Sequence, residues 1–459
     1  MGKTPASIFR DYDIRGKVGS DLSVQTAFDI GRAFGTILRR SGSTTVCVGR
    51  DGRLSSLDLE QDLIKGLQSC GIHVTSVGLG PTPFLYFAQR YLEVDAGVMI
   101  TGSHNPPDEN GFKLVCYGSP FFGPQIQRLY QRIEADDFVE ANIKGKLEIV
   151  QILDSYRLDL LERLSWGEYP LKVAWDPGHG AAGIVLEDLL PKLPGTHHLL
   201  HGPVDGRFPS RSPDPTAPGS LDSLSAFVRE KGFDLGIALD GDGDRMVVVD
   251  DLGHVWAGDE VLAFFVMHML HGYEALAFVQ DVKCSSFLSN WLKTQHAVPF
   301  FSKTGHVHVK ALMKEKNILI GGEMSGHFFF RDQHPGYDDG LYAALRFLTC
   351  FSKSPTPLSQ WLNQLPERHS TPELRLPCQD DQKDTVIEKV KAHYQEKGTP
   401  FHDLDGIRVE DQDGWWILRA SQTQACLVAR FESSTSEGLI QQQQDVMGLL
   451  RQFGLGDIP

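Results

Sequence analysis

Cysteine, long apolar runs and positive charge are all scarce in this sequence of 459 residues. The seven cysteines are odd in number, widely scattered and form no C-x-x-C pair, which argues against a disulfide framework and indicates a reducing compartment. The longest apolar run, residues 261–270 broken by His268, covers about half of a membrane span. The opening MGKTPASIFRDYDIRG lacks the apolar core of a signal peptide. We therefore expect a cytoplasmic protein without a membrane partner.

The shortage of positive charge narrows the range of partners. Lys and Arg number 44 against 59 Asp and Glu, which gives a net charge of -15. Such a surface repels nucleic acid, so no nucleic-acid partner is expected. A small anionic substrate is still compatible, because a few Arg and Lys residues gathered in a cleft reverse the local potential. No G-x-x-x-x-G-K-[S/T] sequence is present, so ATP is not the evident source of a phosphoryl group.

The chain is too long for one hydrophobic core, and its 41% hydrophobic and 22% charged residues are typical of globular proteins. Strand and helix patterns alternate from residue 44, again from 171 and a third time from 259, which favours mainly parallel sheets with helices on both faces. After about residue 365 a Pro- and Ser-rich connection leads to a helix and two strands. We predict three successive α/β domains (1–150, 151–254 and 255–367) with mainly parallel mixed sheets, and a smaller C-terminal α+β domain (368–459), around a central cleft.

The loop at residues 101–113, TGSHNPPDENGFK, directly follows the apolar strand AGVMI. Ligands bind beyond the carboxyl ends of strands in open parallel sheets. Ser103 can present its hydroxyl there as a nucleophile, with His104 and Lys113 as nearby groups to handle protons. The same Gly, Asn, Pro and Asp residues would also suit an ordinary polar turn.

A second loop, DGDGDR at residues 240–245, follows another apolar strand. Asp240, Asp242 and Asp244 alternate along what we expect to be a near-extended loop, and three carboxylates crowded together repel one another without a cation. Their hard oxygen ligands favour Mg²⁺ over zinc or copper. A solvated acidic turn is the alternative interpretation.

Three weaker patterns complete the candidate chemistry. The loop GGEMSGH (321–327) offers groups suited to sugar hydroxyls, and Lys283 and KTGH (303–306) add cationic or imidazole groups at strand ends. Arg419 with RASQTQ (419–424) has the composition of a small phosphate cradle, although a polar hairpin tip would look the same. The glycines of GHGAAG (178–183) match a dinucleotide-binding pattern in form, but a tight strand-to-helix turn explains them equally well.

Taken together and in order, these motifs resemble the α-D-phosphohexomutase superfamily, specifically its bacterial phosphomannomutase/phosphoglucomutase branch. The resemblance covers nearly the whole chain. It is carried by FRDYDIRG (9–16), GRDGR (49–53), TGSHNP with NGFK (101–113), DGDGDR (240–245), DVKC (281–284), KTGH (303–306), GEMSGH (322–327) and RASQT with ARFE (419–432).

The resemblance implies a role for each matching position. Ser103 would be the phosphoserine and, with Asp240, Asp242 and Asp244, would bind Mg²⁺. Arg245 would steady the transferring phosphate, and His104, Lys113, Tyr12 and Arg15 lie at the family's positions for proton transfer. The sugar would contact the GEMSGH loop and two cleft residues, namely Glu323, Met324, Ser325, Gly326, His327, Lys283 and His306. The non-reacting phosphate would be held by Arg419, Ser421, Gln422 and Thr423. Gln422 and Ala425 depart from the family's usual Asn and Pro.

The implied activity is a phosphohexomutase that interconverts mannose or glucose 1-phosphate and 6-phosphate through a phosphoserine enzyme and a hexose 1,6-bisphosphate, which also serves as activator. Alternatives are an aminosugar-phosphate mutase, a phosphoserine-dependent sugar phosphatase and an inactive sugar-phosphate-binding relative. We expect sugar phosphates as partners and a monomer or weak dimer.

Overall fold

The computed structural model describes residues 4–354, 356–421 and 425–455. The chain divides into two compact units. The first contains residues 1–257 and 325–360, and the second contains residues 258–324 and 361–459. The polypeptide therefore passes from one unit to the other three times, at 257/258, 324/325 and 360/361.

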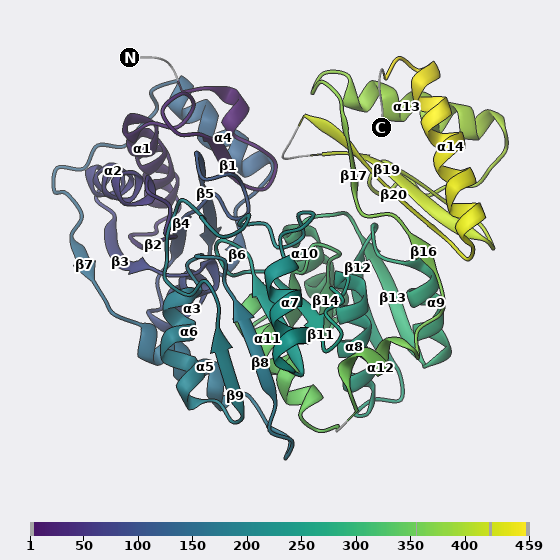
Figure 1. The fold of residues 1–459 in the computed structure, drawn as a ribbon. Helices are drawn as coiled ribbons and strands as arrows, with labels where there is room; N and C mark the ends of the chain where they lie inside the picture. Colours follow the sequence, from purple (N-terminus) through teal and green to yellow (C-terminus); the bar gives the residue numbers. More distant parts are fainter. Residues whose placement is uncertain (1–3, 355, 422–424, 456–459) are drawn as a thin grey trace. The chain divides into compact units, whose positions relative to one another are not determined.

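The first unit contains two sheets, and the larger one is formed by the N-terminal part of the chain (Figure 1). Its strands run in the order β1 (Ile14–Lys17), β5 (Glu109–Cys116), β4 (Ala96–Ile100), β2 (Thr45–Arg50), β3 (His73–Leu79) and β7 (Leu147–Ile149), and β6 (Ser119–Pro120) pairs with β5. The four neighbouring strands β4, β2, β3 and β7 are parallel to one another. Strand β5 is antiparallel to β1 and to β4, between which it lies. The central strand β4 is buried along its whole length, as expected of a parallel strand covered on both faces.

Four helices belong to this part of the chain: α1 (Val24–Arg40), α2 (Ser56–Ser69), α3 (Thr82–Tyr91) and α4 (Pro124–Glu134). Helices α1 and α2 cross in close contact at two glycines. A Cβ on Gly31 would lie 2.3 Å from the Leu63 carbonyl oxygen, and one on Gly66 would lie 2.2 Å from the Phe28 carbonyl oxygen. Any side chain at either position would push the two helices apart.

The second sheet of this unit has the order β11 (Met246–Asp250), β10 (Leu235–Leu239), β8 (Lys172–Asp176) and β9 (Thr196–Leu199). The β10 strand is parallel to β8 and antiparallel to β11. Helices α5 (Leu153–Glu162), α6 (Gly183–Leu189), α7 (Asp222–Lys231) and α11 (Gly340–Phe351) also belong to this unit, with the short strand β15 (Phe328–Phe330). Helix α11 contacts β10 and β11, so a late segment of the chain supports the turn that joins them.

The second unit also contains two groups of strands. Strand β12 (Leu276–Asp281) is parallel to β13 (Ala297–Ser302) and to β14 (Ile320–Gly322), with helices α8 (Gly258–Leu270), α9 (Ser286–Thr294) and α10 (His306–Lys316). The C-terminal sheet is antiparallel, in the order β16 (His369–Ser370), β20 (Cys426–Ser433), β19 (Gly414–Ala420) and β18 (Ile407–Glu410), with β17 (Leu374–Pro377) on β20. Helices α13 (Lys383–Glu396) and α14 (Ser436–Gln452) pack against this sheet (Figure 1).

The fold class predicted from the sequence is confirmed, since three mostly parallel α/β sheets are followed by an antiparallel α+β sheet. The connection predicted around residue 365 contains two short elements that were not expected. A short helix, α12 (Leu358–Leu362), and the strand β16 lie within the stretch of Pro, Ser and Thr residues. Leu358 is completely buried, and this packing outweighs the weak helix propensity of the surrounding residues.

Candidate active site

Ser103 lies in the loop between β4 and β5, where its side chain is buried (1% exposed). Its φ of 50° is in the left-handed region, which costs a residue with a Cβ roughly 1–2 kcal/mol. The Ser103 N–H donates to Thr101 Oγ1 (2.8 Å), and the Thr101 hydroxyl donates to Asp51 Oδ2 (2.8 Å). Asp51 follows β2, the neighbour of β4. Two adjacent strand ends therefore hold Ser103 in this conformation.

Arg53 and Arg15 bind the backbone of the same loop. Nη2 of the buried Arg53 donates to the carbonyl oxygens of Ser103 (2.8 Å) and Asn105 (2.6 Å). Gly102 leaves room for it, because a Cβ there would lie 2.6 Å from Arg53 Cζ. Arg15 Nη1 donates to the Gly102 carbonyl oxygen (3.0 Å) and to Asn105 Oδ1 (2.9 Å). Both guanidinium groups thus add positive charge around Ser103.

Asp240, Asp242 and Asp244 lie in the turn between β10 and β11 and are buried. One carboxylate oxygen from each lies within 4.8 Å of the others. The near-extended conformation expected for this loop is wrong. The Gly243 N–H donates to the Asp240 carbonyl oxygen (3.1 Å), and Gly243 has a φ of 71°. This tight turn brings together side chains that would be about 6.5 Å apart along an extended chain.

The acidic turn has the donor set of a Mg²⁺ site. All three donors are hard carboxylate oxygens, and Asp242 Oδ1 is buried without a hydrogen-bond partner. Burial first, and then the neighbouring Asp244 and Asp242, raise the pKa of Asp240 well above its ordinary value. A divalent cation would relieve this repulsion and satisfy Asp242 Oδ1, so the residues fit the metal predicted from the sequence.

The Ser103 hydroxyl connects the two loops. It donates to Asp240 Oδ2 (3.3 Å) and lies 3.2 Å from His104 Nδ1. Burial, and then the positive charges of Arg245 and Arg15, lower the pKa of His104 well below its ordinary value. The imidazole is therefore neutral near pH 7.

Lys113 lies on β5 opposite Met99 of β4 and reaches the acidic turn. Its Nζ donates to Asp242 Oδ2 (2.7 Å) and Asp244 Oδ2 (2.5 Å). Burial alone would lower the pKa of Lys113, but the two carboxylates more than offset this effect and raise it. Lys113 is therefore a permanent cation in this arrangement and acts as a donor.

Arg245 and His327 also contact the aspartates of the acidic turn. The Arg245 N–H donates to Asp240 Oδ1 (3.2 Å), and Arg245 Nε lies 3.3 Å from His327 Nε2. His327 Nε2 is 3.4 Å from Asp244 Oδ1, and its Nδ1 is 3.1 Å from Ser325 Oγ. The first unit therefore brings together most of the positions predicted within it: Arg15, Ser103, His104, Lys113, Asp240, Asp242, Asp244, Arg245, Ser325 and His327. Gly326, with a φ of 92°, accepts the Met246 N–H (3.0 Å), and Tyr12 is half-buried.

In the second unit, Lys283 is buried beside two carboxylates. Its Nζ donates to Glu373 Oε1 and lies 3.7 Å from Asp281 Oδ2. Burial opposes ionisation of Glu373, but Lys283 and then Arg375 and Arg419 lower its pKa to about 2. The influence of Arg419 on Glu373 indicates that the cations Lys283 and Arg419 act on a common region of this unit.

Arg419 is fixed by a carboxylate that the sequence did not single out. Its Nε donates to Asp405 Oδ2 (2.9 Å), and the same oxygen accepts the Thr304 N–H (3.0 Å). Asp405 therefore joins the end of β19 to the KTGH segment. Next along the KTGH loop, the Gly305 N–H donates to the buried Glu323 Oε1 (2.7 Å).

The structure places the remaining described positions in the second unit. His306 is the first residue of α10, directly after Gly305. Met324 contacts Arg430 through its sulfur (3.3 Å). The Ser421 N–H donates to the Cys426 carbonyl oxygen (3.0 Å), and the Ser421 carbonyl oxygen accepts from Lys383 Nζ (2.6 Å). Gln422 and Thr423 lie outside the described residues.

Sequence reasoning gave no role to five residues that hold the site together: Asp51, Arg53, Thr82, Glu373 and Asp405. Asp51 and Arg53 lie in the GRDGR motif directly after a buried strand, and their position was a usable signal. No local pattern marks Thr82, Glu373 or Asp405, because each acts on a residue far away in sequence.

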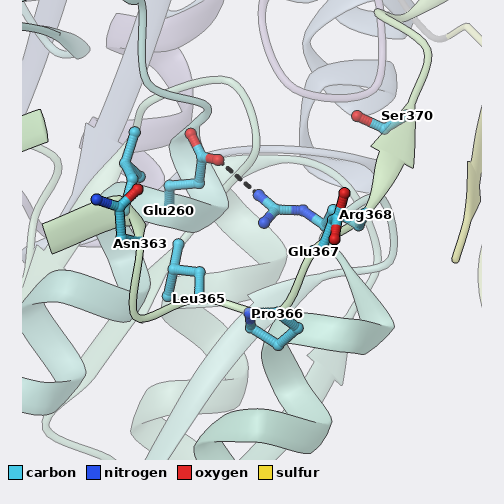
Figure 2. A pocket seen from close by; sticks show the side chains of 8 residues that line it. Glu260, Asn363, Leu365, Pro366, Glu367, Arg368 and Ser370 are labelled. Atoms are coloured by element: carbon cyan, nitrogen blue, oxygen red, sulfur yellow. Dashed lines mark hydrogen bonds and ion pairs between the residues drawn. The ribbon is translucent and has the colours of Figure 1, made fainter. Parts of the chain in front are cut away.

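A cavity of about 430 Å³ opens in the second unit beside the connection to β16 (Figure 2). Arg368 Nη2 donates to Glu260 Oε1 (2.6 Å), and Arg368 Nε lies 3.4 Å from Glu432 Oε2. The cavity is lined by Glu260, Leu362, Asn363, Leu365, Pro366, Glu367, Arg368 and Ser370. None of the described site residues named above lines it. We assign it a structural role, since two carboxylates already engage its arginine.

Across the residues described by the structure, no helix is both long and apolar enough to cross a membrane.

Comparison with known protein families matches four successive segments. The phosphoglucomutase/phosphomannomutase α/β/α domain I matches residues 6–140, domain II matches 154–253, domain III matches 257–369, and the C-terminal domain matches 373–449.

Individual proteins agree with these matches. A phosphomannomutase/phosphoglucomutase of Pseudomonas aeruginosa is 42% identical over 435 residues, covering 95% of this chain and 93% of that protein. A phosphoglucomutase of Neisseria meningitidis is 38% identical over 441 residues, covering 96% and 95%. The crystal structure of a phosphoglucomutase/phosphomannomutase family protein from Burkholderia thailandensis superposes with a TM-score of 0.91 at 38% identity, covering 98% of both chains.

Proposed function

The chain belongs to the phosphoglucomutase/phosphomannomutase family of the α-D-phosphohexomutase superfamily, and we infer from this that it interconverts hexose 1-phosphates and hexose 6-phosphates. The enzyme is an isomerase that moves a phosphoryl group between two hydroxyls of one sugar. The observation that carries this conclusion is the match of all four family domains, in order, together with 42% identity over 435 residues to a phosphomannomutase/phosphoglucomutase. The matched segments also support domain limits at 1–150, 151–254, 255–367 and 368–459.

We propose that Ser103 carries the phosphoryl group. Its Oγ–P bond breaks as the free hydroxyl of a hexose monophosphate forms a new O–P bond, and the product is a hexose 1,6-bisphosphate. The bisphosphate then returns its other phosphoryl group to Ser103 Oγ. Phosphoryl transfer depends on positioning and on neutralising charge on the transferring oxygens. The fixed backbone of Ser103, the Arg15 guanidinium on its loop and the Arg245 guanidinium, whose Nε lies 3.7 Å from Asp240 Oδ2, support this assignment.

The substrate hydroxyl must lose its proton as it attacks. His104 is neutral and close to Ser103 Oγ, which makes it a candidate base. His327 is a second candidate, because Ser325 and Arg245 fix its ring. Lys113 is cationic, and we propose that it stabilises negative charge.

We propose that Asp240, Asp242 and Asp244 hold Mg²⁺ together with the Ser103 phosphate. When bound, the cation would neutralise charge on the transferring phosphoryl oxygens and orient them. The three carboxylates keep their convergent arrangement through the turn closed at Gly243 and through the contacts of Lys113.

The remaining predicted positions are suited to the parts of the substrate that do not react. We propose that Glu323 and the neighbouring Met324, Ser325, Gly326 and His327 recognise sugar hydroxyls. Lys283 and His306 would line the cleft that receives the sugar, and Arg419, Ser421, Gln422 and Thr423 would bind the non-reacting phosphate. The carboxylates that hold Lys283 and Arg419 in place support this assignment, because they orient each cation before a ligand arrives.

Mannose and glucose phosphates are the proposed substrates, with hexose 1,6-bisphosphate as activator. An aminosugar-phosphate mutase is not favoured by the names of the relatives at 38–42% identity. We also propose a cytoplasmic enzyme that acts on small sugar phosphates as a monomer or weak dimer, without a nucleic-acid or membrane partner.

A coupled assay tests the function. The purified protein is given mannose, glucose, glucosamine or N-acetylglucosamine 1-phosphate, and both the 6-phosphate and inorganic phosphate are measured. We expect 6-phosphate from the mannose and glucose compounds with comparable efficiency, and little inorganic phosphate. Phosphate release without isomer formation would make the protein a phosphatase. A preference for N-acetylglucosamine 1-phosphate would overturn the sugar assignment alone.

A further inference from the structure

Thr82 is a buried residue of helix α3 that touches the acidic turn from a distance of 160 positions in sequence. It is the first residue of the helix and lies between Pro81 and Pro83. The N-cap position is Pro81, and no side chain caps the helix. Thr82 lies one residue after the N-cap, which is the position where a threonine hydroxyl would cap the helix. Its hydroxyl instead donates outside its own helix.

Two hydrogen bonds join Thr82 to Asp242. The Thr82 N–H donates to the Asp242 carbonyl oxygen (2.7 Å), and the Thr82 hydroxyl donates to Asp242 Oδ2 (2.5 Å). The start of helix α3 lies so close to the acidic turn that residue 243, which follows Asp242, has little room for a side chain. A Cβ on Gly243 would lie 3.0 Å from Pro81 Cβ and 3.1 Å from Ala182 Cβ. One residue thus fixes both the backbone and the carboxylate of Asp242.

The hydroxyl also determines which oxygen of Asp242 remains available. Asp242 Oδ2 already accepts from Lys113 Nζ (2.7 Å), so the Thr82 hydroxyl is a second donor to the same atom. Asp242 Oδ1 is buried and accepts no hydrogen bond. Two donors on one oxygen prevent the carboxylate from rotating about its Cβ–Cγ bond.

We propose that Thr82 is a positioning residue for Asp242, which fixes the carboxylate so that Oδ1 is presented to the divalent cation while Oδ2 is kept by protein donors. The inference rests on the proposed Mg²⁺ site, and it names a residue outside the acidic turn that sets the affinity of that site. Groups that orient metal ligands from behind typically change metal affinity by about 10- to 100-fold when removed. Lys113 alone would hold Asp242 Oδ2 less firmly, since a flexible ammonium does not define one direction.

The experiment compares Thr82→Val, which keeps the shape without the hydroxyl, with Thr82→Ser, which keeps the hydroxyl. The Kd for Mn²⁺ is measured by paramagnetic resonance on the full-length protein, and Mg²⁺ competition gives the Kd for Mg²⁺. We expect Thr82→Val to weaken both by about 10-fold or more, and Thr82→Ser to stay within about threefold of wild type. With saturating Mg²⁺, the KM for glucose 1-phosphate should change little in either variant.

Thr349→Val is the matched control. Its buried hydroxyl donates to a carbonyl oxygen of its own helix (Arg346, 2.9 Å), so this variant loses a similar group without touching the acidic turn. Its metal affinity should equal that of wild type. If Thr82→Val fails to fold, Thr82→Ala against Thr82→Ser gives the same contrast, because the two differ by one oxygen atom.

Three results would overturn the inference: unchanged metal affinity in Thr82→Val, equal weakening in Thr82→Ser, or equal weakening in Thr349→Val. Wild type that binds no Mn²⁺ or Mg²⁺ would instead refute the proposed metal site. The two failures are therefore distinguishable.

Discussion

Ser103 adopts a left-handed backbone conformation although it has a side chain. Glycine would adopt this conformation without strain, so the backbone alone would favour glycine at this position. The sequence instead has a residue with a hydroxyl group. Backbone strain of this kind persists only where surrounding groups enforce it, and here Thr101 and Arg53 do so. The combination of strain, burial and converging cations is what we expect of a nucleophile.

Replacing Ser103 by Ala should lower turnover by at least about 1,000-fold, because the phosphoryl group loses its acceptor. Intact-mass spectra of the purified wild type should show one phosphate on part of the protein, and peptide mapping should locate it at Ser103. The variant should lack it. Ser20→Ala, at an exposed position, is the control. A phosphate at another residue, together with a fully active Ser103→Ala variant, would refute the mechanism.

The sequence predicts some positions of the candidate site and not others. Ser103 and the three aspartates follow apolar strands directly, so the position of each loop beyond the carboxyl end of its strand was predictable from the sequence. The two strands belong to different sheets, so the pattern did not show that the loops would meet. Their convergence at Asp240 Oδ2 depends on the turn at Gly243, which alternation alone misrepresented as extended. Asp405 and Glu373 could not be foreseen, because nothing near them in sequence shows that they would face Arg419 and Lys283.

At the scale of elements, helix α11 begins at a carboxyl group with an unusual pKa. Asp339 Oδ1 caps the helix by accepting the Tyr342 N–H (2.8 Å), and Asp339 Oδ2 accepts from the Tyr156 hydroxyl (2.8 Å). Burial raises the pKa of Asp339 from 3.8 to about 7, and hydrogen bonds from Tyr342 and Tyr156 only partly oppose this. His334 lies 3.8 Å from the same carboxyl group.

Asp339→Asn should therefore gain stability over wild type as the pH rises from about 4 to about 7. The unfolded carboxyl group loses its proton near 3.8 and the folded one near 7, so the folded state binds more protons in this window and wild-type stability falls across it. Asn keeps the cap but does not titrate. Calorimetric melting at pH 5 and pH 8 measures the effect, with exposed Asp58→Asn as control. A constant difference at both pH values would contradict the assignment.

The hairpin of β19 and β20 presents Arg419 at its end, held by Asp405. If Arg419 anchors the phosphate that is not reacting, Arg419→Ala should raise KM about 10- to 100-fold in both directions, with a smaller effect on kcat. Arg419→Lys should rescue it only partly, because Lys lacks the two-pronged geometry. Dependence on added hexose 1,6-bisphosphate should increase, since the intermediate escapes more often.

Initial rates with 1-phosphate and 6-phosphate substrates, with and without the bisphosphate, measure this effect. Arg451→Ala on α14, at an exposed position, is the control. Unchanged KM in both directions would mean that the RASQT segment is only a hairpin tip.

The molecule as a whole carries 59 acidic against 44 basic residues. We expect so acidic a surface to attract divalent cations weakly at many places, so a specific site is best tested by its effect on activity. Excess chelator should abolish activity, and free Mg²⁺ should restore it along a single saturating curve, because the acidic turn otherwise leaves the transferring phosphate uncompensated. Asp242→Asn should shift this curve to at least about 10-fold higher Mg²⁺. Full activity in excess chelator would exclude the metal.

Because the chain passes between its two units three times, the first unit is completed late during synthesis. Residues 325–360 complete the first unit, yet the ribosome makes them after residues 258–324 of the second. A nascent chain that ends at residue 257 already contains Ser103 and the three aspartates. It still lacks the Gly340 N–H that donates to the Gly243 carbonyl oxygen (3.1 Å) and the His327 ring beside Asp244. The acidic turn thus gains its last two supports only when the chain has been made as far as α11, and an arrested fragment would carry the reactive residues with only part of their supports.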